Sequence, residues 1–398
     1  MSDTMATPLA GTKVVDLTRF VAGSYATMLL AALGAEVLKI EVPPGGDSYR
    51  GQGAVKTETG STLFESLNRA KRSVVLDFRE PDGSQALEAL LAGGDFLVHN
   101  ARPGSLARHG LDFAAVHERH PHLVYAAISA FGDVGPDATR GGFDLIVQAA
   151  SGLMAVTGSP ESGPVKVGAP VLDVGAGLAV VIAILAAHSQ RASTGIGGEV
   201  SSSLLEFALA GLTTLTPDVV ATGVAPPLLG THSPTFAPYG AFAAGDGYLV
   251  LAGAGSDRLW PLLCEVLERA DLVDDPRFVD NATRVAHRDE LTAEIEAVLA
   301  RRDVADWLVQ LDAAGVPAGT VRSLPDLLAS EQVAALGQLR APDGSAQGPH
   351  VEVPFRLGGN RPHLGPAPAL GADTRAVLTD AGVDTAVVDR ICAAGGLR

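Results

Sequence analysis

The chain has 398 residues, of which 47% are hydrophobic and 19% are charged. This composition is ordinary for a globular protein and excludes a disordered, collagen-like or coiled-coil chain, and the length suggests two or three domains of roughly 100–200 residues each. The net charge of −16 at pH 7 argues against non-specific binding to nucleic acids or anionic membranes, so neither is expected as a partner.

Cysteine usage and the N-terminus bear on the compartment. Cys264 and Cys392 are the only cysteines, too few for a disulfide framework or a cysteine-based zinc site, so a cytoplasmic location is expected. The first twelve residues lack the pattern of a signal peptide. The most apolar run, residues 178–187, is shorter than the ~20 residues of a membrane-spanning helix and predicts a buried core helix.

The first 130 residues alternate between strand and helix signals. Short apolar or β-branched runs predict strands at residues 13–17, 36–40, 73–77, 95–98 and 123–129. Helices are expected between them at residues 25–32, 87–91 and 113–119, and Ser24 would cap the first of these. Strands that recur with helices between them predict a parallel sheet covered on both faces, so the expected fold class is α/β with a Rossmann-like large domain.

The pattern changes after residue 143. Longer apolar stretches predict helices at 143–155, 174–188 and 200–222, and four prolines then mark 223–239 as a long loop. A β-hairpin is expected at 242–252, followed by amphipathic helices at 257–267, 290–300 and 304–314. We therefore predict a large domain over residues 1–219, a smaller α+β domain over 220–325, and a C-terminal segment over 326–398 that returns to the large domain.

Several common motifs are absent. The chain has neither a phosphate-binding P-loop nor the G-x-S-x-G motif of serine hydrolases. Gly175-Ala176-Gly177 begins like a dinucleotide fingerprint, but Val180 stands at the third glycine, so we favour small residues that let a helix pack closely. The histidines of 117–122 are interrupted by Pro121 and charged neighbours, which favours a solvated helix end, and no metal site is predicted.

One carboxylate stands alone in an apolar, glycine-rich segment. Asp173 precedes a long hydrophobic run, where an aspartate is a good helix N-cap, and composition alone favours that structural role. The alternative is a nucleophile, because a carboxylate that loses its hydration in a dry pocket can attack an acyl thioester. Adjacent glycines, Gly175 and Gly177, would then supply backbone N–H groups to a developing oxyanion.

A wider set of segments accompanies Asp173, in order and along nearly the whole chain. These segments are residues 9–11, 14–19, 33–41, 45–47, 68–73, 100–104, 143–145, 148, 151–152, 157–158, 194–197 and 367–371. With them the sequence resembles the class III CoA-transferases, the group that includes formyl-CoA transferase and carnitine CoA-transferase. The resemblance implies a two-domain subunit in an interlocked homodimer, with each chain threaded through a ring formed by the other.

The resemblance also implies a mechanism. Asp173 would attack the donor acyl-CoA to give a mixed anhydride and free CoA thiolate. The thiolate would return to form an aspartyl-CoA thioester, from which the acceptor carboxylic acid is activated in turn. Coenzyme A is thus expected as a substrate, with no tightly bound cofactor.

Further positions carry over from the family. Those that correspond to CoA contacts are Val21, Ala22, Leu76, Arg79, Asn100, Ala101, Arg102 and Arg108. Arginine suits such a site because its guanidinium can fork onto phosphate oxygens, although Arg79 and Arg108 are also compatible with solvated surface charges. Asp144 matches an acidic position close to the nucleophile, where it would either orient the site or cap the helix at 145.

Departures from the family pattern bear on specificity. Val21 replaces a glutamine of the formyl-CoA enzymes and removes a polar partner for a small acid, so formyl or oxalyl specificity is not expected. Val42 replaces an arginine near the adenine, and residues 252–256 are poorer in glycine than the family's mobile flap. The apolar residues of 226–229 and 236–239 favour a branched, aromatic or medium-sized acyl group.

Three alternatives stay open. The α-methylacyl-CoA racemases share the fold but place a proton-exchanging histidine where this chain has Phe143, which disfavours racemisation. A non-catalytic CoA-binding protein would keep the basic contacts without needing Asp173. A dinucleotide-dependent oxidoreductase is disfavoured by the incomplete fingerprint.

Overall fold

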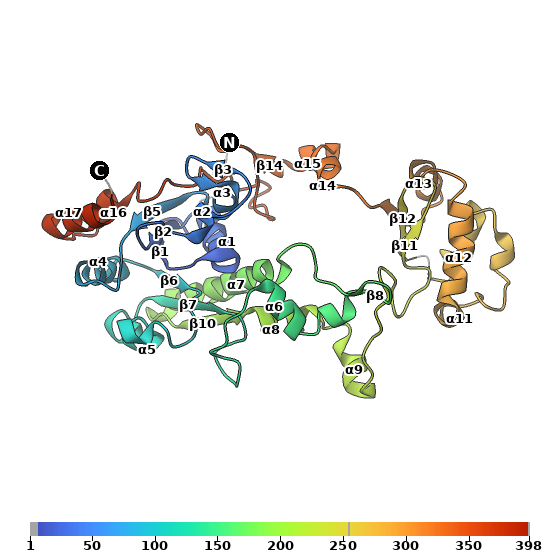
Figure 1. Ribbon diagram of the computed structural model, residues 1–398, viewed down its shortest axis with the longest axis horizontal. Coiled ribbons are helices and arrows are strands. Elements are labelled where there is room, and N and C mark those ends of the chain that lie inside the picture. Colours follow the sequence, from blue (N-terminus) through green and yellow to red (C-terminus); the bar gives the residue numbers. More distant parts are fainter. Residues whose placement is uncertain (1–6, 254, 397–398) are drawn as a thin grey trace. The chain divides into compact units, whose positions relative to one another are not determined.

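The computed structural model describes residues 7–253 and 255–396 (Figure 1). Its contacts group into two compact units. The large unit comprises Met1–Ser151, Gly168–Thr213 and Glu331–Arg398, and the small unit comprises Gly152–Val167 and Thr214–Ser330. The site described below lies within the large unit.

A six-stranded parallel sheet forms the centre of the large unit. Its strands are β1 (Lys13–Asp16), β2 (Glu36–Glu41), β5 (Lys71–Val75), β6 (Phe96–His99), β7 (Val124–Ser129) and β10 (Glu199–Ser203). They lie in the order β10-β7-β6-β1-β2-β5, so the chain winds outward in one direction from β1 and in the other from β6. This reversal between β1 and β6 is a topological switch point, where α/β sheets bind ligands at the carboxyl ends of the strands.

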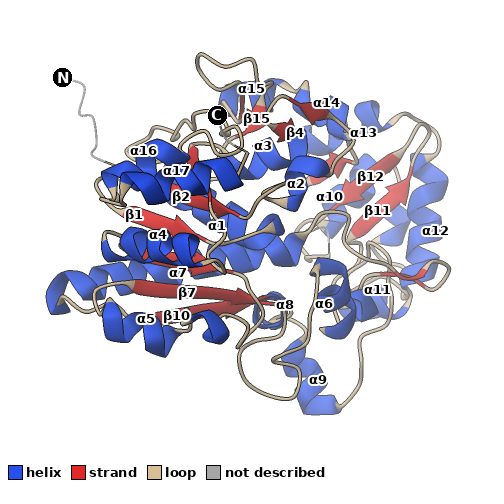
Figure 2. Cartoon of the chain, turned by 60° about the vertical axis from the view of Figure 1, so that its left-hand side comes forward, coloured by secondary structure: helices blue, strands red, loops and turns tan. Residues whose placement is uncertain are grey.

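Helices cover both faces of this sheet, as the sequence predicts (Figure 2). Successive side chains of a strand point to opposite faces, and β6 shows the two layers. Leu97 joins the core with α4 (Pro81–Ala92), α5 (Phe113–Arg119) and α17 (Thr385–Ala394), while the Phe96 ring contacts His188 of α7 (Val171–Thr194). Because the inner strands β1, β6 and β7 are largely buried on both faces, they appear in the sequence as short continuous apolar runs rather than as an alternating pattern.

Most predicted elements of the large unit form, with shifts at their ends. The helix expected from residue 25 is α1 (Phe20–Ala32), so Ser24 is buried inside the helix and does not cap it. The helix expected at 143–155 ends earlier, as α6 (Asp144–Ala150). Residues at the start of the expected helix 200–222 instead form the edge strand β10, because they pair with β7, and α8 (Leu204–Gly211) follows the strand. Local pattern alone does not reveal such an edge pairing.

Helix α7 is longer than the apolar run that predicted it. It has 24 residues, and by length and composition it is apolar enough to cross a membrane, but 39% of its most apolar window is buried in the structure. Helices α8 and α9 (Thr216–Thr222), bent by 80°, pass the same test only if they are taken together as one span. A core helix of a globular protein also meets these criteria, so they are weak evidence for a membrane span.

The small unit is built around a three-stranded antiparallel sheet, β11 (Gly240–Ala243), β12 (Tyr248–Leu251) and β13 (Ala318–Thr320). The first two strands form the hairpin that the sequence predicts, and apolar side chains such as Phe242, Trp260 and Trp307 fill the core beside it. The unit also holds β8 (Gly158–Ser159), β9 (Gly163–Pro164), α10 (Trp260–Val266), α11 (Asn281–Ala286), α12 (Arg288–Leu299), α13 (Val304–Ala313) and α14 (Leu324–Leu328).

The large unit also holds several shorter elements. They are α2 (Ser48–Gly51), β3 (Lys56–Thr57), β4 (Gly60–Ser61), α3 (Thr62–Asn68), α15 (Glu331–Leu336), β14 (Leu339–Arg340), β15 (His350–Val351) and α16 (Thr374–Asp380). A buried ion pair of 3.1 Å between Arg69 and Glu352 ties the C-terminal segment to the loop after α3. This segment also supplies the carbonyl of Pro368, which accepts a 3.0 Å hydrogen bond from Arg50 in α2.

Candidate active site

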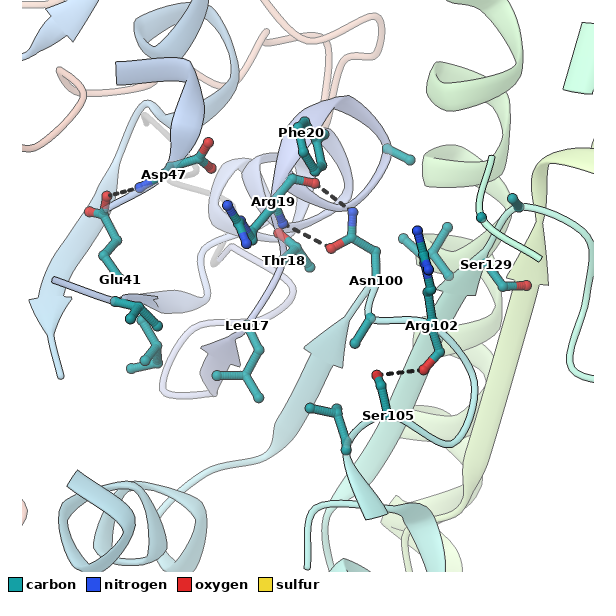
Figure 3. Close-up of a pocket in the computed structure, with 18 of the residues that line it drawn as sticks. Leu17, Thr18, Arg19, Phe20, Glu41, Asp47, Asn100, Arg102, Ser105 and Ser129 are labelled. Carbon is teal, nitrogen blue, oxygen red and sulfur yellow. Dashed lines mark hydrogen bonds between the residues drawn. The ribbon is translucent and has the colours of Figure 1, made fainter. Parts of the chain in front are cut away.

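A cavity of about 1000 Å³ opens at the carboxyl ends of β1, β2, β5 and β6 (Figure 3). Each strand contributes the residues that follow it to the lining: 17–20 after β1, 42–47 after β2, 78–79 after β5 and 100–103 after β6. The cavity therefore spans the switch point between β1 and β6, the position at which parallel α/β sheets bind their ligands. Its size suits an organic ligand with several functional groups.

Asn100 holds the two sides of the switch point together. Its side-chain carbonyl accepts a 2.9 Å hydrogen bond from the backbone N–H of Arg19, and its amide donates to the backbone carbonyl of the same residue (Figure 3). Both ends of the amide thus link the loop after β1 to the loop after β6. Although Asn100 lines the cavity as expected, the structure gives its side chain a loop-bridging role.

Buried ion pairs form the floor of the cavity and position the loop after β2. The Lys39 ammonium lies 2.9 Å from the Asp47 carboxylate and donates a 3.1 Å bond to the backbone carbonyl of Thr18. Burial alone lowers the pKa of Lys39, but the carboxylates of Asp16 and Asp47 outweigh burial and raise that pKa above its usual value. Glu41 accepts a 3.0 Å hydrogen bond from the backbone N–H of Asp47, which fixes the backbone of the loop after β2. The floor of the cavity thus combines this fixed backbone with positive and negative side chains that pair with one another.

Three arginines predicted to bind CoA line the cavity and are exposed: Arg79, Arg102 and Arg108. Arg79 forms a bidentate pair with Asp77, at 2.5 and 2.7 Å, and Arg108 donates to a ring nitrogen of His109 at 3.0 Å. The lining also includes two arginines that the sequence did not single out, Arg19 and Arg140. On a chain of net charge −16, this grouping provides a local site for phosphate or carboxylate groups.

Asp173 lies in the first turn of α7 and is half-buried on the cavity wall. The N-cap position belongs to Pro170, so the prediction that Asp173 caps the helix is wrong. Asp144 takes that role from a different helix. One of its carboxylate oxygens accepts the backbone N–H groups of Leu172, at 2.9 Å, and of Asp173, at 3.3 Å.

The same arrangement changes the acidity of Asp173. Burial of the carboxyl group and then the nearby charge of Asp144 raise the pKa of Asp173 from 3.8 to about 7. The structure does not give Asp144 the predicted role of capping the helix at 145, because Phe143 is the N-cap of α6. Asp144 instead caps α7 and thereby holds the backbone of Asp173. Carboxyl groups with a strongly raised pKa in a cavity are typical of functional sites.

The glycines after Asp173 serve helix packing. A Cβ atom on Gly175 would lie 1.9 Å from the ring of Phe207, and one on Gly177 would lie 2.7 Å from the backbone carbonyl of Ala22 in α1. Both residues lie beyond the first turn of α7, where the helix's own carbonyl groups accept the backbone N–H groups. The expectation that these N–H groups face an oxyanion is therefore wrong, whereas the close packing predicted for the small residues is confirmed.

Three aromatic rings form a connected group on the cavity wall. Phe20 makes edge-to-face contacts with Tyr49, at 5.7 Å between ring centroids, and with Phe143, at 5.4 Å. Phe20 has a φ angle of 63°, which is unusual for a bulky residue and is found preferentially at functional sites. The sequence analysis considered Phe143 only as the replacement of a histidine and missed Phe20 and Tyr49, because ring contacts between distant segments leave no local pattern.

The other predicted CoA contacts divide into two groups. Ala22 and Ala101 line the cavity with the arginines and Asn100. Val21 and Leu76 are buried, at 9% and 1% exposure, and lie outside the lining. No group of three or more His, Cys, Asp or Glu side chains suited to a metal ion occurs among residues 7–253 and 255–396.

Comparisons with known proteins identify the family. Residues 9–374 match CoA-transferase family III. A succinyl-CoA:glutarate CoA-transferase of Mus musculus is 36% identical over 380 residues, covering 94% of this chain and 86% of that protein. A succinate–glutarate CoA-transferase of Agrobacterium fabrum is 34% identical over 384 residues, covering 94% of this chain and 95% of that protein.

A solved structure agrees with the sequence comparison. A CAIB/BAIF family protein from Brucella suis superimposes with a TM-score of 0.85 at 34% identity, and the match covers 94% of this chain and 99% of that chain. The structural superposition, the family match over residues 9–374 and the identity to named CoA-transferases agree. The chain belongs to CoA-transferase family III and is a CoA-transferase.

Proposed function

We propose that this enzyme moves CoA from an acyl-CoA to a free carboxylic acid through covalent intermediates on Asp173. The observation that carries the proposal is a half-buried carboxylate on the wall of the cavity, with a raised pKa and with its backbone held by a second carboxylate. Because such a group loses little hydration when it attacks, it is a better nucleophile than a carboxylate in water.

The reaction proceeds by exchange of acyl bonds. An Asp173 oxygen adds to the thioester carbonyl carbon. The C–S bond then breaks, CoA leaves as thiolate, and a mixed anhydride between Asp173 and the donor acyl group remains. The thiolate then attacks the Asp173 carbonyl carbon, the anhydride C–O bond breaks, and the donor acid leaves. The acceptor carboxylate attacks the resulting aspartyl-CoA thioester, the C–S bond breaks, and CoA thiolate leaves behind a second mixed anhydride. The thiolate then attacks the acceptor's carbonyl carbon, the anhydride C–O bond breaks, and Asp173 leaves as a free carboxylate.

The arginine-rich rim of the cavity would hold the phosphates of CoA. Arg79, Arg102 and Arg108 lie on the loops after β5 and β6 and present exposed guanidinium groups to the cavity. We assign the large unit the role of a Rossmann-like CoA-binding domain, since its strand order reverses at the cavity. CoA enters as a substrate and leaves as a product, without a tightly bound cofactor.

For the acids themselves we propose short dicarboxylic acids. The relatives from Mus musculus and Agrobacterium fabrum are named for succinate and glutarate. The second carboxylate of such an acid needs a cation in the cavity, and the lining includes Arg19 and Arg140 in addition to the arginines assigned to CoA. The apolar residues 226–229 and 236–239 favour a branched, aromatic or medium-sized acyl group, and a substrate panel separates these from the dicarboxylic acids.

The proposal includes an interlocked homodimer in the cytoplasm. The helices α6, α7 and α8 pack against one another, and each leaves a large apolar side chain exposed: Ile146 at 43%, Ile182 at 69% and Leu209 at 52%. A second copy would cover such a surface. Cys264 and Cys392 are both free and buried, in keeping with a reducing compartment.

The test is intact-protein mass spectrometry after incubation with succinyl-, glutaryl-, isobutyryl- and benzoyl-CoA, followed by hydroxylamine. We expect a CoA or acyl adduct that hydroxylamine removes, that maps to Asp173, and that is absent from Asp173→Ala. Asp343→Ala, which removes an 84% exposed carboxylate, serves as the matched control and should label normally. No adduct with any donor, together with solvent deuterium entering the α-carbon of isobutyryl-CoA, would contradict the proposal and favour a racemase.

A further inference from the structure

Attack on a thioester requires a donor for the developing oxyanion, and the nearby backbone offers few. The N–H groups of Leu172 and Asp173 are accepted by Asp144, and those of Gly175 and Gly177 lie inside α7. A transition state with an unstabilised oxyanion is slow, because donors placed in advance contribute much of the rate in acyl transfer. A side-chain donor on the cavity wall would fill this need.

Tyr49 is a polar side chain on this wall with an available hydrogen. Its ring contacts Phe20, Phe20 contacts Phe143, and Phe143 directly precedes the Asp144 that holds Asp173. No hydrogen bond from the Tyr49 hydroxyl to another group occurs within the described residues 7–253 and 255–396, and the residue lines the cavity. Its phenol O–H is therefore available for a hydrogen bond to a ligand in the cavity.

The backbone of Tyr49 is fixed on both sides. Its N–H donates to Asp47 at 3.0 Å, and its carbonyl accepts a 2.6 Å bond from the Ser61 hydroxyl. The next residue, Arg50, pairs with the buried Glu41 at 2.7 Å and also donates to the carbonyls of Thr59 and Pro368. A short helix of four residues is thus held by hydrogen bonds to three other segments, which is the kind of support that a catalytic group needs.

We propose that the Tyr49 hydroxyl donates a hydrogen bond to the carbonyl oxygen of the acyl group as Asp173 attacks it. This inference rests on the proposed function, because it requires a tetrahedral intermediate on Asp173. As the C–O bond to Asp173 forms, the carbonyl electron pair moves to oxygen, and the phenol stabilises that charge without transferring its proton. When the intermediate collapses, the C–S bond breaks and the hydrogen bond weakens.

The surroundings of Tyr49 keep its hydroxyl a donor. Burial, followed by the charges of Asp173 and Asp47, raises the pKa of Tyr49 above its ordinary value of 10. The phenol therefore stays neutral and protonated across the pH range in which Asp173 ionises. A neutral donor adds no charge that would pair with the Asp173 carboxylate and weaken it as a nucleophile.

The experiment compares Tyr49→Phe with the wild type in single-turnover labelling of Asp173, using whichever CoA thioester of the panel labels the wild type fastest. The phenylalanine keeps the ring contact with Phe20, and the lost hydroxyl leaves no protein group without its partner. We expect labelling to slow by about 10²–10³-fold, the usual loss for one oxyanion donor, with CoA affinity and melting temperature unchanged. Tyr248→Phe, at a 58% exposed position in β12, is the matched control and should label at the wild-type rate.

Each other outcome overturns the inference in a recognisable way. Labelling within tenfold of the wild type removes Tyr49 from the chemistry, while labelling of the wild type itself still supports the proposed function. If Tyr49→Phe lowers only the affinity for CoA, Tyr49 is a binding residue. If the acidic limb of the pH–rate profile for labelling shifts while the plateau rate is unchanged, the Tyr49 hydroxyl donates its hydrogen bond to Asp173 instead. Absence of labelling in the wild type with every thioester overturns the proposed function and this inference with it.

Discussion

Two carboxylates with different tasks define the candidate site at the scale of single residues. Asp144 accepts backbone N–H groups at the start of α7, and its charge raises the pKa of Asp173. The attack requires Asp173 in its ionised form. Because its pKa is about 7, the ionised fraction grows as the pH rises through 7 and is nearly complete above 8. The rate of acyl transfer to Asp173 should follow the same curve.

Replacement of Asp144 by Asn tests this coupling. Asn keeps an oxygen that accepts the N–H groups of Leu172 and Asp173, but it removes the charge that opposes ionisation of Asp173. We therefore expect the acidic limb of the pH–rate profile to move to lower pH in Asp144→Asn, as measured by single-turnover labelling between pH 5 and 9. Asp144→Ala removes the cap as well and should lower stability by about 0.5–2 kcal/mol. An acidic limb that stays in place in the Asn variant would contradict the coupling.

At the scale of secondary-structure elements, the close approach of α7 and α1 positions the site. Gly177 lets α7 lie against the carbonyl of Ala22 in α1, and α1 begins at Phe20 on the cavity wall. The nucleophile in the first turn of α7 and the aromatic group at the start of α1 are therefore positioned by one helix–helix contact. A change in the spacing of these helices should affect both.

Gly177→Ala tests the contact. Its Cβ would lie 2.7 Å from the Ala22 carbonyl, a backbone atom that can move only with the helix. We expect a loss of stability of about 1–3 kcal/mol, typical of overpacking, together with slower labelling of Asp173. Gly211→Ala in α8 is the matched control, since no atom lies within 4 Å of its added Cβ, and it should leave both measurements unchanged or raise stability slightly. Equal effects of the two variants would rule out a special role for the contact.

At the scale of the whole molecule, one chain leaves apolar surface uncovered. Ile182 is 69% exposed in the middle of α7, and α7 has the apolar composition of a core helix. Exposed apolar side chains on adjacent helices favour association, and the family resemblance supplies the expected form, an interlocked homodimer. The same surface explains why α7 meets the composition test for a membrane helix.

Ile182→Asp tests the association. A charge buried in an interface without a partner costs several kcal/mol, so the variant should elute as a monomer of 40.6 kDa in light-scattering chromatography, where the wild type elutes at twice that mass. Ile182→Val keeps the apolar surface and should remain dimeric. A wild type of 40.6 kDa at micromolar concentration would contradict the dimer, and a dimeric Asp variant would move the interface away from α7.

Local chemistry determined much of this protein from its sequence. Apolar runs separated by helical patterns predicted the parallel sheet, because strands buried on both faces need continuous apolar residues. The isolated Asp173 was found because a charged residue in an apolar, glycine-rich segment stands out, whereas the arginines after β5 and β6 were carried over from the resemblance to the family. The segments shared with a known family predicted CoA transfer, and the comparisons confirmed that activity.

The tertiary structure decided what depends on distant partners. The edge strand β10 exists through pairing with β7, and the role of Asp144 comes from a helix that begins 27 residues later. The backbone of the glycines after Asp173 turned out to belong to the helix interior, and Phe20 and Tyr49 joined the site through ring contacts. Sequence patterns report the environment of neighbours along the chain, whereas an active site is set by side chains that meet only after folding.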